Sequence, residues 1–189
     1  MTDSANPSEA DSVNQTQVGR GEAMIRRAEP ADADGLSAML SRLSDLSLYF
    51  RFQTAVGRPP RPTLVEPLLT PTGDAWVAER DDLLVGHGMW AWAKGDSVPT
   101  AELAVVIAES DQRRGLGLRM MNLAAAAAYA AGAIRLLMVV SAANDRVIRM
   151  IRRHLPYSAV ERDGALLNYF APVTALHLAF EDQRLLSVK

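Results

Sequence analysis

One short segment near the middle of the chain combines glycines and basic residues in a spacing that can bind phosphate. The apolar run 103–108 leads into a turn, residues 109–117, and a strongly helical segment follows at once. The start of a helix offers unpaired backbone N–H groups and the positive end of the helix dipole. Because Gly115 and Gly117 place no side chain in the way, the segment predicts a pyrophosphate cradle.

A bare Gly-x-Gly before a helix also suits a tight strand-to-helix turn, so the residues alone leave both interpretations open. Two better-defined motifs are excluded. No Gly-Lys-Ser/Thr follows, so the segment is not a P-loop, and the Gly-x-Gly-x-x-Gly spacing of dinucleotide-binding folds is absent. The chain has no cysteine, which excludes disulfides, thiolate metal sites and a cysteine nucleophile. His154 and His177 lack metal-site spacing, so we expect no metal.

The elements that position this segment follow from the spacing of apolar residues. Strands are expected over residues 24–28, 75–78, 83–92, 100–108, 135–140, 157–161 and 165–170. Helices are expected from Asp32, as the N-cap, to residue 43, and over 44–52, 116–129 and 144–155, with one or two helical turns over 63–69. This order predicts an α/β fold, a single domain with a mixed central sheet of about seven strands and helices on both faces.

Composition sets the outer limits. The chain has 189 residues, enough for one domain, and a net charge of -2, which creates no field favouring nucleic acid or an anionic membrane. Residues 1–22 are polar and unlike a signal peptide, so we expect a disordered leader. Residues 173–189 are expected to form a partly helical tail anchored by Leu176, Leu178, Phe180 and Leu185. The apolar segment 123–134 is too short to span a bilayer. We therefore expect a cytoplasmic protein that binds neither nucleic acid nor membrane.

The segment Gln112-Arg-Arg-Gly115-Leu-Gly117 resembles the acetyl-CoA signature Arg/Gln-x-x-Gly-x-Gly/Ala of the GNAT (Gcn5-related N-acetyltransferase) superfamily. It also stands in the same context, between the fourth strand and the third helix. The resemblance covers residues 23–172 and implies a GNAT domain whose co-substrate, acetyl-CoA, binds in an opening between the fourth and fifth strands. The residues that it assigns to this co-substrate are Val105, Val106 and Ile107 beside the pantetheine, Gln112, Arg113, Arg114, Gly115, Leu116, Gly117 and Leu118 at the pyrophosphate, and Asn144 on the CoA arm.

Two further segments resemble bacterial protein lysine acetyltransferase (Pat-type) domains. Ser47-Leu-Tyr-Phe-Arg-Phe52 is similar to their Ser-x-Tyr-x-Arg-Phe segment, and Ala101-Glu102 is similar to the Ala-Glu at the start of their fourth strand. The resemblance implies that Glu102 is the general base, since an amine with a pKa near ~10.4 must lose a proton before it attacks. The alternative is a strand-end carboxylate that faces solvent or pairs with an arginine. A backbone N–H near Val106 is expected to polarise the thioester carbonyl.

The remaining polar candidates are expected to be structural. We interpret Glu109 and Asp111 as solvated turn residues and His87 as a partly buried structural histidine. Arg146, Arg149 and Arg153 share one helical face, which is expected to be solvated, with contact to the CoA 3′-phosphate as the alternative. His154-Leu-Pro-Tyr157 stands where the Pat-type group often has Gly-Phe.

The predicted function is therefore that of an N-acetyltransferase. It moves the acetyl group of acetyl-CoA to a primary amine, such as a protein lysine, by direct attack. Two alternatives stay open: a non-catalytic acyl-CoA-binding sensor, and an enzyme that acetylates small-molecule amines. The acceptor contacts come from variable loops, so the sequence leaves the acceptor, the acyl-chain preference and the existence of a homodimer undecided.

Overall fold

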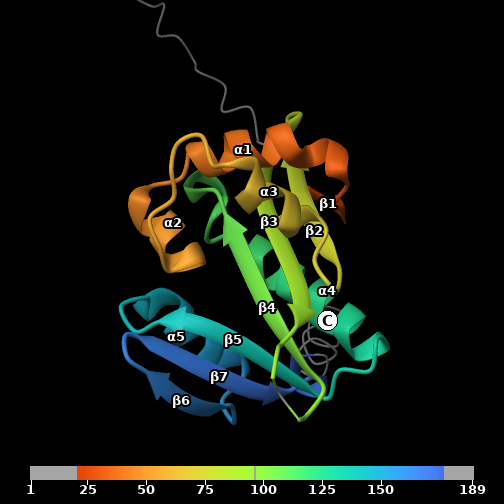
Figure 1. Ribbon diagram of the computed structural model, residues 1–189, viewed down its shortest axis with the longest axis vertical. Helices are drawn as coiled ribbons and strands as arrows, with labels where there is room; N and C mark the ends of the chain where they lie inside the picture. Colours follow the sequence, from red (N-terminus) through yellow and green to blue (C-terminus); the bar gives the residue numbers. More distant parts are fainter. Residues whose placement is uncertain (1–20, 96, 177–189) are drawn as a thin grey trace, which may run out of the picture.

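Seven strands form one mixed sheet in the computed structural model of the chain, which describes residues 21–95 and 97–176 (Figure 1). The strands lie in the order β1-β2-β3-β4-β5-β7-β6, and all neighbours are antiparallel except β4 and β5, which are parallel. This confirms the predicted seven-stranded mixed sheet. The strands are β1 (Met24–Arg27), β2 (Ala75–Arg80), β3 (Leu83–Trp92), β4 (Thr100–Ile107), β5 (Arg135–Ser141), β6 (Ala159–Asp163) and β7 (Leu166–Pro172).

Helices cover both faces of the sheet, as expected (Figure 1). One face carries α1 (Ala33–Ser41), α2 (Asp45–Phe52) and α3 (Pro62–Leu69), and the other carries α4 (Leu116–Ala130) and α5 (Asp145–His154). Two short 3-10 turns, η1 (Pro30–Asp32) and η2 (Glu109–Asp111), precede α1 and α4. Each face has its own hydrophobic core, so the sheet is covered on both sides around β3 and β4.

The close approach of α4 to β3 depends on two glycines of that strand. A Cβ on Gly86 would lie 3.2 Å from Met120 Sδ, and one on Gly88 would lie 3.2 Å from Met120 Cβ. Met120 itself is fully buried. Larger residues at these two positions would push α4 away from the sheet, and with it the turn that precedes the helix.

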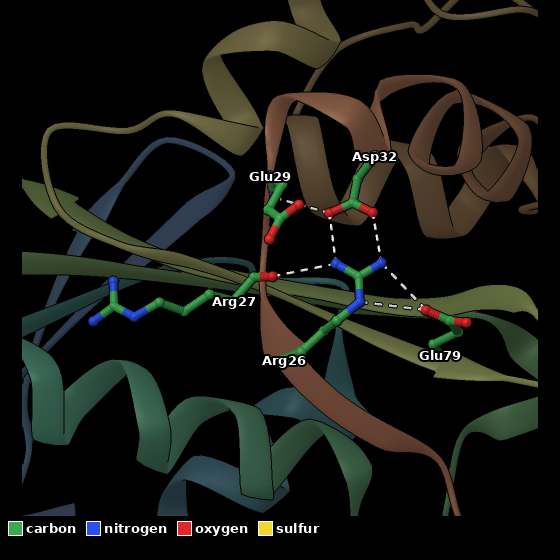
Figure 2. Close-up of polar contacts among 5 residues, drawn as sticks. All are labelled: Arg26, Arg27, Glu29, Asp32 and Glu79. Atoms are coloured by element: carbon green, nitrogen blue, oxygen red, sulfur yellow. Dashed lines mark hydrogen bonds and ion pairs between the residues drawn. The ribbon is translucent and has the colours of Figure 1, made fainter.

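Asp32 stands at the N-cap position of α1, as predicted, but its side chain makes no capping bond to that helix. Instead its two oxygens accept hydrogen bonds of 2.7 and 2.8 Å from the Arg26 guanidinium, and one also accepts from the Glu29 N–H at 2.8 Å (Figure 2). The hydrogen bonds from Arg26 keep the pKa of Asp32 below its ordinary value although burial opposes them. Arg26 also reaches Glu79 on β2. This network joins β1, η1 and β2 and is structural.

The observed bounds of some elements differ slightly from the predicted ones. β6 begins two residues later than expected, because the Ser158 N–H bonds to the Leu155 carbonyl and closes a turn after α5. Leu176, an expected tail anchor, is buried. His177, Leu178, Phe180, Leu185 and most of the predicted leader lie outside the described residues. Within the part of the chain that the structure describes, no helix has the length and apolar character needed to cross a membrane.

Candidate active site

Strands β4 and β5 begin side by side and then separate. Their register runs from Thr100↔Arg135 through Ala101↔Leu136 to Glu102↔Leu137 and ends there, although β4 continues to Ile107 and β5 to Ser141. The strands visibly diverge towards α2 and α5 (Figure 1). The second half of β4 therefore keeps β3 on one side and has an edge that β5 does not pair on the other.

The direction of the β4 backbone groups follows from two hydrogen bonds to β3. The Thr100 carbonyl accepts from the Ala93 N–H, and the Ala108 N–H donates to the Val85 carbonyl, both at 2.9 Å. Because backbone groups alternate along a strand, even-numbered residues of β4 point to β3. The N–H groups of Val105 and Ile107 therefore face the opening. Among the N–H groups near Val106, those of Val105 and Ile107 are the ones that can serve the carbonyl, since the Val106 N–H points to β3. That role stays a prediction.

The turn after β4 presents the free end of a long helix. Gly115 is the N-cap of α4 with φ of 77°, and no side chain caps the helix. The first intrahelical bond runs from the Arg119 N–H to the Gly115 carbonyl, so the N–H groups of Leu116, Gly117 and Leu118 lack helical acceptors. The left-handed backbone at Gly115 suits glycine. A Cβ on Gly117 would sit in ordinary contact with Ile107 Cγ1, at 3.6 Å.

Both acidic residues of η2 hold this turn in place. Asp111 is 1% exposed and forms an ion pair with Arg80 of β2, and it also accepts from Ser110 Oγ at 2.7 Å. Glu109 accepts from the Ser44 N–H at 2.9 Å and from Ser44 Oγ at 2.8 Å. The prediction of a solvated turn is wrong for Asp111. The turn is therefore anchored to β2 through one carboxylate and to the start of α2 through the other.

Gln112 connects the end of β4 with α5, which lie on the two sides of the opening. Its Nε2 donates to the Ile107 carbonyl at 2.9 Å, and its Oε1 accepts from Arg146 on α5. Arg146 is exposed, as expected, and in addition it is tied to the turn through this bond. Asn144 is the N-cap of α5, where its side-chain oxygen accepts from the Val147 N–H at 3.2 Å. Its amide nitrogen is the group that can donate to a ligand.

The carboxylate expected to act as base stands where the strands part. Glu102 belongs to the last register pair of β4 and β5, and its side chain is exposed. It lies on the α1–α3 face of the sheet, because residues of β4 alternate between faces and Val106 packs into the core on that face. A water molecule or an amine can therefore reach Glu102.

Arg51 interacts with the charge of Glu102, and His87 in turn interacts with the charge of Arg51. Burial lowers the pKa of Arg51, in the last turn of α2, to about 10, and the charge of Glu102 opposes this shift. His87 of β3 is fully buried, and its Nε2 donates to the Leu68 carbonyl at 2.9 Å. Burial, helped by the charge of Arg51, lowers the pKa of His87 to about 4. His87 is thus a neutral, structural histidine, as the sequence suggested, but more completely buried.

Sequence reasoning missed Arg80 as an anchor and left Arg51 without a role of its own. Arg80 ends a β-strand and carries no motif, so no sequence signal marks it. Arg51 lies 51 positions before Glu102 in the chain, but the Ser-x-Tyr-x-Arg-Phe segment was a usable signal for it.

Tyr157 is 95% exposed. Among the described residues, no group of three or more His, Cys, Asp or Glu side chains is arranged to hold a metal ion.

The comparisons with known proteins agree with this geometry. The sequence matches the Acetyltransferase (GNAT) family over residues 42–155, more than half of the chain. No curated protein matches it. The GNAT domain of Streptomyces lividans PAT has a similar fold, with a TM-score of 0.71 at 20% identity, covering 80% of this chain and 91% of that one.

Two other solved structures share the fold. The putative acetyltransferase yncA from Salmonella typhimurium, solved with acetyl-CoA, has a TM-score of 0.56 at 17% identity, covering 80% of this chain and 93% of its own. A ribosomal-protein-alanine N-acetyltransferase from Brucella melitensis has a TM-score of 0.58 at 20% identity, covering 79% and 98%. At these identities the likeness supports the fold alone. On the match to the family itself, the chain belongs to the GNAT family of acetyl-CoA-dependent N-acetyltransferases.

Proposed function

We propose that this enzyme transfers the acetyl group of acetyl-CoA to a primary amine, with Glu102 as the general base. The observation that carries the proposal is the place of Glu102, on the last residue pair before β4 and β5 separate. From there the unpaired edge of β4 leads directly to the uncapped start of α4. A base, a strand edge and an anion site thus follow one another along 17 residues, from 102 to 118.

The residues present fit acetyl-CoA, because an uncapped helix start suits a pyrophosphate and an open strand edge suits the amide-bearing pantetheine arm. When bound, acetyl-CoA supplies an activated acetyl group with a thiol leaving group. The first-turn N–H groups of Leu116, Gly117 and Leu118 would hold the pyrophosphate, and exposed Arg113 and Arg114 add positive charge beside it. Val105 and Ile107 would bind the arm through their outward N–H groups.

In this scheme each group has one task in the reaction. Glu102 removes a proton from the acceptor ammonium, directly or through a water molecule, and so frees the lone pair that attacks. An outward β4 N–H, from Val105 or Ile107, polarises the carbonyl of the acetyl group. Asn144 can donate its amide to the CoA arm while its oxygen caps α5.

A protein lysine is the acceptor that the Pat-type resemblance suggests. The Ser47–Phe52 segment and Ala101-Glu102 carry that resemblance, and the fold is similar to that of the S. lividans PAT domain. Small-molecule amines are the competing acceptors. An acetyl-CoA turnover assay over lysine peptides and small amines separates these classes, and it also tests the remaining alternative of a silent acyl-CoA-binding module, which turns over none of them.

The role of Glu102 is tested by Glu102→Gln. General-base catalysis typically contributes ~10²–10⁴-fold, so kcat should fall by about that factor with little change in acetyl-CoA affinity. The acidic limb of the kcat/KM profile should also disappear. Glu161→Gln, on the exposed strand β6, is the matched control and should behave as wild type. If the pH profiles of wild type and Glu102→Gln coincide and their rates agree within about threefold, Glu102 is structural.

A further inference from the structure

Arg51 holds its positive charge at the edge of the core and forms no ion pair with another described residue. Leu48, one turn of α2 before Arg51, and the adjacent Phe52 pack against the core of the α1–α3 face. Arg51 lies on the same side of the helix as Leu48, because residues three apart share a face. Its guanidinium carbon lies 5.0 Å from the centre of the Phe52 ring. Its Nε is buried and has no hydrogen-bond partner among the described residues.

Two further side-chain atoms are buried without a hydrogen-bond partner among the described residues. The Nδ1 of His87 and the Oε1 of Gln53, two residues after Arg51, are also buried without a hydrogen-bond partner in the described part of the chain. The low pKa of His87 leaves that ring uncharged at neutral pH, so it does not compete for an anion. Buried polar atoms without partners are rare in folded proteins. Among these three atoms Arg51 Nε is the donor, because the Nδ1 of a histidine that donates from Nε2 and the amide oxygen of Gln53 are both acceptors. An anion can therefore pair with Arg51 and with neither of the other two.

The charges of Glu102 and Arg51 interact, but the two side chains do not form an ion pair. Glu102 favours the charged form of Arg51, yet the ion pairs formed within residues 21–95 and 97–176 do not include one between these two side chains. The structure therefore keeps a carboxylate and a guanidinium close together and separate. A molecule with an ammonium and a carboxylate of its own would complement both.

We infer that Arg51 binds a carboxylate of the acceptor while Glu102 faces its amine, so that the enzyme prefers amines that carry a nearby carboxylate. A guanidinium matches a carboxylate with two parallel hydrogen bonds, which an ammonium side chain or a neutral ligand cannot reproduce. The inference rests on the proposed function and narrows its substrate class. The carboxylate can belong to a free amino acid or to an acidic residue beside a lysine.

The test compares acceptors that differ only in charge. The probes are ω-amino acids from β-alanine to 6-aminohexanoate and the corresponding ω-amino amides, whose shape is nearly the same. Wild-type kcat/KM should favour the acids by about 10- to 100-fold, the range of a charge-assisted hydrogen-bonded pair. Lysine peptides with a neighbouring Asp, or Asn in its place, form the second arm and show whether the carboxylate comes from a protein.

Variants of Arg51 test whether this residue causes the preference for acids over amides. Arg51→Gln should raise KM for the preferred acids far more than for the amides, so that the preference for acids disappears, whereas Arg51→Lys should keep part of the preference. Equal wild-type rates on acids and amides, or an equal loss on both in Arg51→Gln, would overturn the inference and leave acetyl transfer intact. Absence of turnover on every amine would instead overturn the proposed function. If Arg51→Gln does not fold, the wild-type comparison still decides.

Discussion

The two ends of the proposed site are built in opposite ways. At the turn before α4, acidic side chains are engaged with the protein itself: Asp111 pairs with Arg80, and Glu109 accepts from Ser44. What faces outward there is backbone N–H, with the exposed side chains of Arg113 and Arg114 beside it. At the other end, in contrast, Arg51 Nε and His87 Nδ1 are buried without a hydrogen-bond partner among the described residues. A ligand would thus meet a fixed backbone at one end and unsatisfied side chains at the other.

This difference explains what each end can recognise. A backbone cradle binds any group of the right charge and shape, which suits a co-substrate that never changes. Side chains without partners gain hydrogen bonds only from a ligand that supplies the right atoms, which suits selection among acceptors. Specificity should therefore be sensitive to substitutions around Glu102, and co-substrate affinity to changes in the backbone of the turn.

The largest effect is expected at the turn itself, from Gly117→Glu. The new side chain would start 3.6 Å from Ile107 Cγ1 and bring a negative charge to the first turn of α4, at the proposed phosphate site. Calorimetric binding of CoA should be abolished. Gly117→Ala is the control, because its Cβ has room, and it should bind CoA nearly as wild type does. Unchanged affinity in a folded Gly117→Glu protein would place CoA elsewhere.

The next largest effect is expected from Asp111→Ala, which leaves the buried Arg80 with only its 3.9 Å contact to the exposed Asp81. Breaking a buried ion pair from one side costs about 3–5 kcal/mol of unfolding free energy. Chemical denaturation of the variant measures this loss. The comparison is Glu22→Ala, which breaks the exposed pair with Arg119 and should cost less than about 1 kcal/mol. Similar losses in the two variants would show that the turn is not anchored through Asp111.

The two ends of the proposed site also differ in how much of each could be predicted from the sequence. The turn is a continuous segment, and Gly115 and Gly117 mark it directly, so the strand, turn and helix were predicted with nearly correct bounds. The sheet was predictable for a similar reason, since apolar alternation is local. The separation of β4 and β5 was predicted only from the family resemblance, because no residue of either strand indicates it.

Contacts between distant segments were not predictable in the same way. Asp111 looked like a solvated turn residue because its partner, Arg80, lies 31 positions earlier and only the fold brings them together. The choice among the N–H groups near Val106 was left open by the sequence for another reason. Alternation along a strand is certain, but its phase depends on which neighbour each residue pairs with, and that was known only from the register with β3.

The smallest of these effects is expected at the second anchor, between Glu109 and Ser44. Burial alone would raise the pKa of Glu109, but the hydrogen bonds from Ser44 and Ser47 outweigh it and bring the pKa below its ordinary value of 4.5. A carboxyl group with a lowered pKa in the folded state stabilises the fold above its unfolded pKa and loses that contribution as the pH falls. At a helix start such a contribution is about 0.3–1 kcal/mol. A double-mutant cycle of Ser44→Ala and Glu109→Gln, followed by denaturation, should show this coupling at pH 7. The coupling should decline below pH 4.5 and vanish once Glu109 is protonated in the folded protein. A coupling that is independent of pH would mean that the hydrogen-bond geometry, and not the charge of Glu109, ties η2 to α2.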